Sequence, residues 1–166
     1  LGICNGFQAL VKSGLLPFGT VKSEMDASDA TLTYNRIGRH QSLSVRTRVS
    51  SVHSPWMAGF EVGEIHTVPV SHGEGRFCAP KKLLDQLAEN GQIAFQYVDL
   101  LGNATSDIRF NPNGSDLAIE GILSPDGRIL GKMGHSERVG DLLQKNLPDA
   151  TADQLKIFAS GVKYFK

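Results

Sequence analysis

The stretch Leu1-Gly2-Ile3-Cys4-Asn5-Gly6-Phe7-Gln8 places a cysteine between two glycines, each two positions away. This spacing is typical of a nucleophile elbow, a sharp turn between a strand and a helix that exposes a reactive side chain. Glycines on both flanks avoid side chains that would collide as the chain folds back. The helix that follows would favour a thiolate on Cys4 and leave backbone N–H groups free to hold an oxyanion. The alternative is an ordinary turn around a buried structural cysteine.

The sequence beyond the elbow mixes helical and strand patterns, which predicts an α/β fold. Apolar residues recur at helical spacing in 7–11, in 83–87 and in the tail 151–166, and strand patterns occupy 43–49, 65–70, 93–98, 117–123 and 129–133. Residues 19–35 are predicted to be polar and irregular. Ser124-Pro125-Asp126-Gly127 predicts a tight hairpin. We expect a layered sheet with its site at the strand ends, where open α/β sheets place ligands.

The composition bounds the class of protein more than its chemistry. With 166 residues the chain fits one domain, and 17 Lys and Arg balance 17 Asp and Glu. This balance gives no electrostatic case for nucleic acid or for an acidic membrane, and no apolar run has the length of a membrane span. Two cysteines, Cys4 and Cys78, without a cysteine framework indicate free thiols in the cytoplasm, with Cys78 in a packing role.

A base for the Cys4 thiol is predicted at His135. His135 directly follows the strand 129–133 and stands two residues before Glu137, so the imidazole and the carboxylate can lie side by side. His72 lies in a glycine-rich loop, 71–77, after another strand. A lone H-x-E pair on the solvated surface is the alternative. The remaining histidines lie in stretches without a supporting pattern: His40, His53 and His66.

The elbow and His135-Ser136-Glu137 resemble class I, triad-type glutamine amidotransferases. Three further stretches make the chain similar to the glutaminase domain of phosphoribosylformylglycinamidine synthase: Pro69-Val70-Ser71-His72-Gly73-Glu74-Gly75-Arg76-Phe77, Asn111-Pro112-Asn113-Gly114-Ser115 and Gly121-Ile122-Leu123-Ser124-Pro125-Asp126-Gly127-Arg128. The resemblance runs from Leu1 to about Asp141, and the C-terminal tail, 142–166, resembles the end of the large single-chain form.

The resemblance implies a flavodoxin-like fold, a three-layer open sheet with flanking helices. Residues 1–166 would then be a single, incomplete glutaminase domain that begins at the elbow. Only three residues precede Cys4, so we expect the domain to be N-terminally truncated, with the supporting strands upstream.

Carried over by matching residues, the resemblance implies a Cys4–His135–Glu137 triad. Cys4 would attack the side-chain amide of glutamine, and His135 would take the thiol proton and later protonate the departing ammonia. Glu137 would orient His135, and water would hydrolyse the glutamyl thioester.

The resemblance also implies the groups around the substrate. The backbone N–H of Asn5 matches one oxyanion donor, whereas the second donor of the family comes from a loop upstream of the elbow. A fragment without that loop is expected to have little glutaminase activity. A turn-forming role for the loop after His72 remains equally open. The residues that match the glutamine surroundings are Gln8, His72, Gly73 and Glu74.

The implied partners are glutamine and a synthetase domain, in cis or in trans, that receives the ammonia. ATP and magnesium would belong to that synthetase domain, so no cofactor or metal is expected in this one. Two other readings stay open: a different cysteine-elbow hydrolase on a similar sheet, and a catalytically silent fragment that docks onto the synthetase.

One departure concerns the segment Met133-Gly134-His135-Ser136-Glu137-Arg138. Many relatives carry proline on both sides of the histidine, where this chain has Gly134 and Ser136. Since proline restrains φ, we expect a looser backbone around His135 and a larger separation from Cys4.

Overall fold

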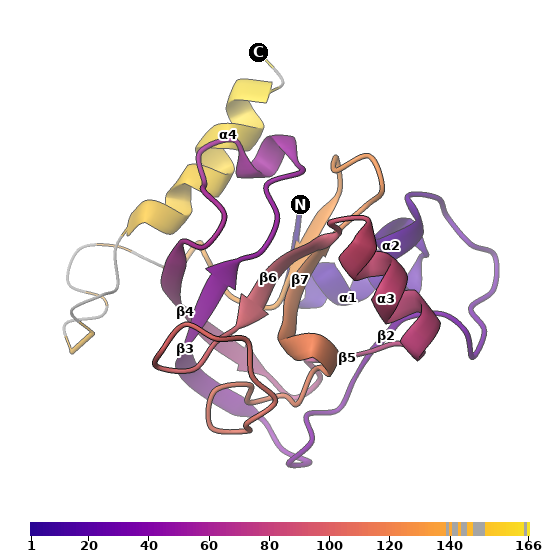
Figure 1. The fold of residues 1–166 in the computed structure, drawn as a ribbon, viewed down its shortest axis with the longest axis horizontal. Helices are drawn as coiled ribbons and strands as arrows, with labels where there is room; N and C mark the ends of the chain where they lie inside the picture. Colours follow the sequence, from indigo (N-terminus) through magenta and orange to yellow (C-terminus); the bar gives the residue numbers. More distant parts are fainter. Residues whose placement is uncertain (139, 141–142, 144–145, 148–151, 165) are drawn as a thin grey trace.

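The computed structural model describes residues 1–138, 140, 143, 146–147, 152–164 and 166. The chain has an α/β fold built on a mixed six-stranded sheet (Figure 1). The strands lie in the order β1 (Gly2–Ile3), β8 (Leu130–Lys132), β7 (Ile119–Leu123), β6 (Ile93–Tyr97), β3 (Gln41–Val49) and β4 (Ile65–His72). β1 runs parallel to β8, and every other neighbouring pair in this sheet is antiparallel.

The predicted strands and helices are present, and several short elements were missed. The helices are α1 (Asn5–Lys12), α2 (Leu15–Phe18), α3 (Lys81–Glu89) and α4 (Lys156–Tyr164), with 3-10 helices at Pro55–Met57, Asp116–Ala118 and Ala152–Leu155. The missed elements include β1, α2 and two further strands, β2 (Thr31–Thr33) and β5 (Arg76–Cys78), which pair with each other outside the main sheet. Three residues are too few to show a period, which explains the miss. Thr151, where the tail helix was expected to begin, lies outside the described residues.

Two apolar clusters hold the helices against the sheet. The first joins Phe7 of α1 and Leu87 of α3 to Ile122 of β7, all at most 1% exposed. The second joins Phe95 of β6 to Ile157 of α4. Figure 1 shows α4 apart from α1, α2 and α3, beside the 3-10 helix Pro55–Met57. Burying such side chains contributes about 1.5–3 kcal/mol each, so both groups of helices are fixed relative to the sheet.

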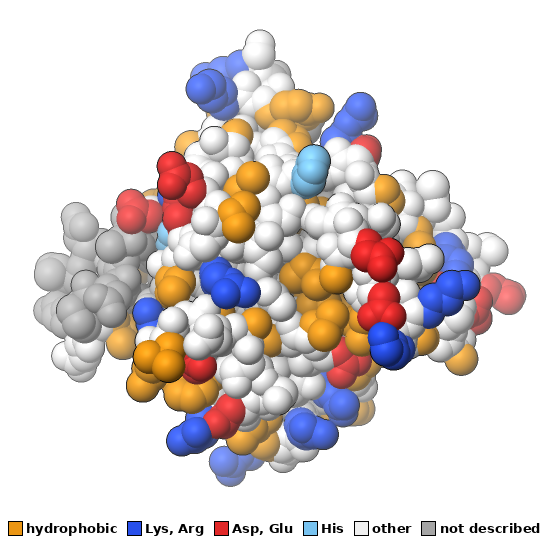
Figure 2. Space-filling model, viewed as in Figure 1, with side chains coloured by type: hydrophobic (Ala, Val, Ile, Leu, Met, Phe, Trp, Pro, Cys, Tyr) orange, Lys and Arg blue, Asp and Glu red, His pale blue; other side chains and the backbone are white. Residues whose placement is uncertain are grey.

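The surface mixes charges of both signs. On the face drawn in Figure 2, Lys and Arg side chains alternate with Asp and Glu. This distribution agrees with the balanced composition. Within the part of the chain that the structure describes, no helix combines the length and the apolar character needed to cross a membrane.

Candidate active site

Cys4 stands at the elbow between β1 and α1. Its backbone has φ 52° and ψ −107°, a conformation that L-residues adopt at a cost of order 1–3 kcal/mol. Gly2 permits the turn, because a Cβ there would lie 2.7 Å from the Gly6 carbonyl oxygen. At Gly6 nothing lies within 4 Å of an added Cβ, so the expectation that both glycines relieve a collision holds only for Gly2.

The Cys4 thiol is half-buried and donates a hydrogen bond to the Ser71 carbonyl oxygen at 3.7 Å. Burial raises the pKa of this thiol, and the charge of Glu137 adds to the rise. The backbone N–H of Asn5 and the charge of Arg138 lower it, without cancelling the effect of burial. The predicted helix contribution is therefore present, but the thiol rather than the thiolate is favoured.

His135 and Glu137 form the predicted pair at the end of β8. The His135 Nδ1 lies 2.5 Å from the Glu137 carboxylate, and the His135 side chain is 9% exposed. Since the carboxylate can only accept, Nδ1 carries the proton and Nε2 presents its lone pair. Nε2 is buried and has no hydrogen-bond partner among the described residues, so no hydrogen bond joins it to Cys4.

The elbow and this pair are nevertheless joined through the backbone of β8. The Cys4 N–H donates to the Lys132 carbonyl oxygen at 2.8 Å, three residues before His135. The backbone around His135 is held by hydrogen bonds: its own N–H donates to Pro69 O at 2.8 Å, and its carbonyl accepts from Arg138 N at 3.0 Å. These bonds restrain the segment in which a looser backbone was expected.

A second buried imidazole, His72, lies at the end of β4. Its Nδ1 is 3.0 Å from the Asn35 side-chain oxygen, which also accepts from the Gly75 N–H at 3.1 Å. Nδ1 is therefore the protonated nitrogen, and the buried Nε2 has no hydrogen-bond partner among the residues described. Burial lowers the pKa of His72 to about 4, with smaller contributions from His40 and His135. His72 is neutral at pH 7, with an acceptor lone pair at Nε2.

The lowered pKa of His72 predicts that the folded protein loses stability in acid. A histidine in the unfolded chain has a pKa near 6.5, whereas His72 in the folded chain has a pKa of about 4. Between these two values the unfolded chain binds a proton that the folded chain does not bind. Stability therefore falls as the pH drops through this window. Between pH 7 and pH 4.5 we expect the free energy of unfolding of the wild type to fall by about 2 kcal/mol more than that of His72→Asn. Urea titrations at both pH values measure the difference, and equal losses would contradict it.

The loop after His72 closes over the start of α1. The Gln8 side-chain amide donates to the Glu74 carbonyl oxygen, which joins α1 to the loop. The Gly73 carbonyl accepts from Asn35 N at 2.9 Å, and the Glu74 side chain is exposed. The predicted substrate residues Gln8, His72, Gly73 and Glu74 thus lie together, beside Ser71, whose carbonyl oxygen accepts from the Cys4 thiol.

Several residues that shape this loop were missed or left without a role. Asn35 lies in a stretch predicted to be irregular, and nothing in the sequence distinguishes it. His40 had no supporting pattern, yet its Nε2 lies 3.1 Å from the Ser71 hydroxyl. Asn113, in one of the quoted stretches, donates to Gly75 O at 2.6 Å and to the Tyr97 hydroxyl at 3.0 Å. The stretch 111–115 therefore holds the loop through hydrogen bonds.

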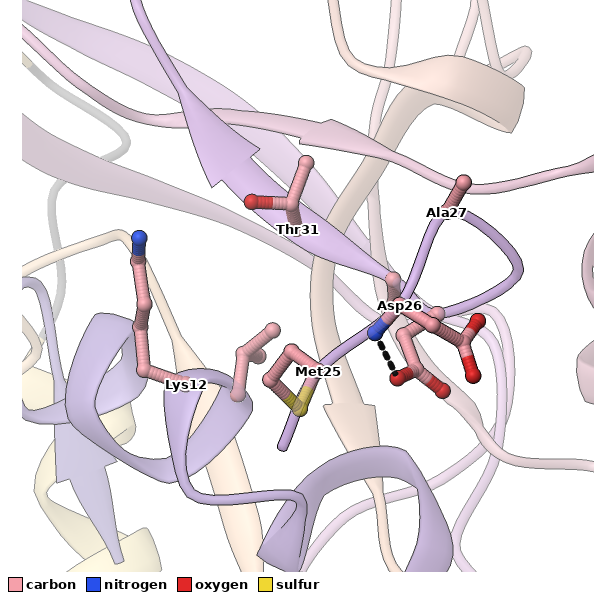
Figure 3. A pocket seen from close by; sticks show the side chains of 8 residues that line it. Lys12, Met25, Asp26, Ala27 and Thr31 are labelled. Atoms are coloured by element: carbon pink, nitrogen blue, oxygen red, sulfur yellow. Dashed lines mark hydrogen bonds between the residues drawn. The ribbon is translucent and has the colours of Figure 1, made fainter. Parts of the chain in front are cut away.

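A cavity of about 210 Å³ lies away from these residues, between α1 and the segment 25–31 (Figure 3). Lys12, Met25 and Thr31 line it, and the Asp26 N–H beside it donates to Asp29 at 2.8 Å. None of the predicted site residues lines it. In the described part of the chain, no three His, Cys, Asp or Glu side chains are grouped as a metal ion would need.

Comparison with known proteins identifies the family of the chain. The CobB/CobQ-like glutamine amidotransferase domain matches residues 1–165. A relative from Synechocystis, named phosphoribosylformylglycinamidine synthase subunit PurQ, is 38% identical over 96% of this chain and 63% of its own length. A protein of the same name from Acaryochloris marina is 40% identical over 85% of this chain and 54% of its own.

A solved structure has a similar fold. A chain in the structure of PurLQS from Thermotoga maritima has a TM-score of 0.71 and 30% identity to this chain. The match covers 99% of this chain and 61% of that one. The chain therefore spans a little over half to under two thirds of the length of these relatives.

Proposed function

Since the chain belongs to the CobB/CobQ-like glutamine amidotransferase domain family, we propose that it is the glutaminase part of a phosphoribosylformylglycinamidine synthase. It hydrolyses glutamine to glutamate and ammonia, and the ammonia converts formylglycinamide ribonucleotide to formylglycinamidine ribonucleotide in purine biosynthesis. The observation that carries the proposal is the strained elbow cysteine together with the hydrogen-bonded pair of the buried His135 and the exposed Glu137, in a chain similar to PurQ subunits.

The proposed mechanism starts from a protonated thiol. Because burial raises the pKa of Cys4, its proton moves to the His135 Nε2 lone pair as the sulfur attacks the glutamine amide carbon. The Glu137 carboxylate holds Nδ1–H and stabilises the imidazolium. The Asn5 N–H, directed at the thiol, serves as one oxyanion donor. His135 then protonates the departing ammonia, and water hydrolyses the thioester.

Glutamine is proposed to bind between α1 and the loop after β4. The His72 Nε2 lone pair is a buried acceptor, suited to an N–H of the substrate. The other proposed substrate residues are Gln8, Gly73 and Glu74.

Ammonia is proposed to pass to a synthetase domain, in cis or in trans, that uses ATP and magnesium. No cofactor or metal is assigned to this chain, and the site of action is proposed to be the cytoplasm. Both Cys4 and Cys78 are free thiols, which suits that compartment.

We further propose that residues 1–166 belong to a single domain with the three-layer, flavodoxin-like architecture, in which further strands would extend the sheet beyond β1. The parallel β1–β8 pair and the two apolar clusters with α1 and α4 support this arrangement.

A glutamine-like affinity label tests the function. In the full-length protein we expect the label on Cys4, with loss of glutamine turnover, and little label on Cys78. The reason is that, of the two cysteines, Cys4 has a helix N–H beside it and the His135–Glu137 pair as its proposed base. Peptide mapping by mass spectrometry identifies the modified thiol, and Cys78→Ala is the control that should retain labelling. Preferential labelling of Cys78, or hydrolysis of esters or peptides in place of glutamine, would replace the proposal with another hydrolase or a silent docking fragment.

A further inference from the structure

A buried ion pair underlies the His135 segment. Lys132 of β8 and Glu120 of β7 are 1% and 0% exposed, and the Lys132 Nζ lies 3.3 Å from Glu120 Oε1. The same ammonium lies 5.0 Å from the centre of the Phe95 ring. Burying two charges carries a large desolvation cost, and apolar residues of similar volume often serve stability as well. Fold stability alone is therefore a poor reason for this pair.

The hydrogen bonds of the pair go to the residues on both sides of His135. The Lys132 Nζ donates to the Gly134 carbonyl oxygen at 3.1 Å and to the Ser136 hydroxyl at 2.9 Å. Glu120 Oε1 accepts from the Gly134 N–H at 2.5 Å. A Cβ on residue 134 would lie 2.7 Å from that oxygen, so glycine is what lets the carboxylate approach.

The Gln154 side chain links Ser136 to β4. The Ser136 hydroxyl donates to Gln154 Oε1 at 2.8 Å, and the Gln154 amide donates to the Thr67 carbonyl oxygen at 3.0 Å. Lys132 also contacts the other half of the site, because its carbonyl oxygen accepts from the Cys4 N–H at 2.8 Å. One residue is therefore bonded both to the elbow and to the segment that carries the base.

We propose that Lys132, Glu120 and Ser136 form a positioning clamp that sets His135 relative to Cys4. The clamp acts through backbone atoms of Gly134 and through the Ser136 side chain, and none of its members needs to touch the substrate. The proposal rests on the proposed function, since it assigns the clamp to the reaction of that site. A misplacement near 1 Å costs about 100-fold in rate, so small changes in the clamp should be visible in turnover.

Two variants test the clamp in the full-length protein. Ser136→Ala removes the hydroxyl that joins Lys132 to Gln154. Glu120→Gln with Lys132→Met removes both charges together. It keeps a side-chain oxygen that can accept from the Gly134 N–H, and it removes the ammonium that donates to Gly134 O and to the Ser136 hydroxyl. The control is Ser54→Ala, which loses a hydroxyl that donates to Gly127 O and accepts from Trp56 N, outside the hydrogen bonds of the clamp.

For both clamp variants we expect kcat with glutamine to fall by about 10- to 100-fold. KM for glutamine should stay within about twofold, because no substrate contact is removed, and synthesis from added ammonia should be unchanged. Amide hydrogen exchange in the peptide 133–138 should become faster. Ser54→Ala should leave all four quantities at the wild-type level.

The outcomes separate the clamp from the function. Unchanged exchange in 133–138 overturns the clamp whatever the kinetics. Faster exchange with unchanged kcat overturns its positioning role. A wild-type protein that does not use glutamine, with exchange as expected, refutes the proposed function and leaves the clamp as the restraint on the His135 segment. Equal loss of glutamine- and ammonia-dependent synthesis means general damage and also overturns the proposal.

Discussion

His135→Ala in the full-length enzyme is expected to lower glutamine-dependent synthesis by about 100- to 10,000-fold, the range that a general acid–base group contributes. Synthesis from added ammonia should continue at the wild-type rate, because free ammonia bypasses the proposed glutaminase. The large effect follows from the buried Nε2 atom of His135, which is proposed to accept the thiol proton. Parallel assays with glutamine and with an ammonium salt give both rates in one preparation.

His53→Ala is the matched control, because His53 is exposed and has no proposed role. It should retain both activities. A loss of both activities in His135→Ala would show that His135 has a structural role, whereas retention of both would remove it from the mechanism.

Glu137→Gln is expected to lower kcat with glutamine by on the order of 1,000- to 10,000-fold with little loss of stability. A Gln amide in place of the carboxylate can donate to Nδ1, which would move the imidazole proton to Nε2 and remove the lone pair proposed to accept the thiol proton. Such a substitution changes the tautomer while preserving shape. Steady-state kinetics with glutamine, together with ¹⁵N NMR of the imidazole, measure rate and tautomer.

Glu89→Gln is the control for removing one carboxylate, since the exposed Glu89 side chain at the end of α3 has no proposed role in the site. It should keep the Nδ1–H tautomer and most of kcat. An unchanged tautomer with unchanged kcat in Glu137→Gln would show that Glu137 does not orient His135.

The elements that local pattern encodes were predictable. The G-x-C-x-G spacing predicted the turn at Cys4, and H-x-E predicted the contact of His135 with Glu137, because both depend on neighbours in the chain. The hairpin at 124–127 followed from its turn residues, and the structure confirms it between β7 and β8. The alternation of helix and strand patterns predicted the α/β class.

Long-range features were not predictable. The period of a strand does not reveal its direction, so the sequence could not show that only β1 and β8 pair in parallel among the described strands of the main sheet. Asn35 supports His72 across 37 positions, and Glu120 meets Gly134 across 14. These contacts depend on how strands pair, and a lone Asn or Glu carries no local signal of its partner.

At position 4, the residue that the proposed reaction needs is not the residue that the positive φ favours. Glycine adopts this region far more readily than a residue with a Cβ, so selection for folding alone would place glycine at position 4. A reactive thiol at this position therefore comes with a conformational cost that glycine would not carry.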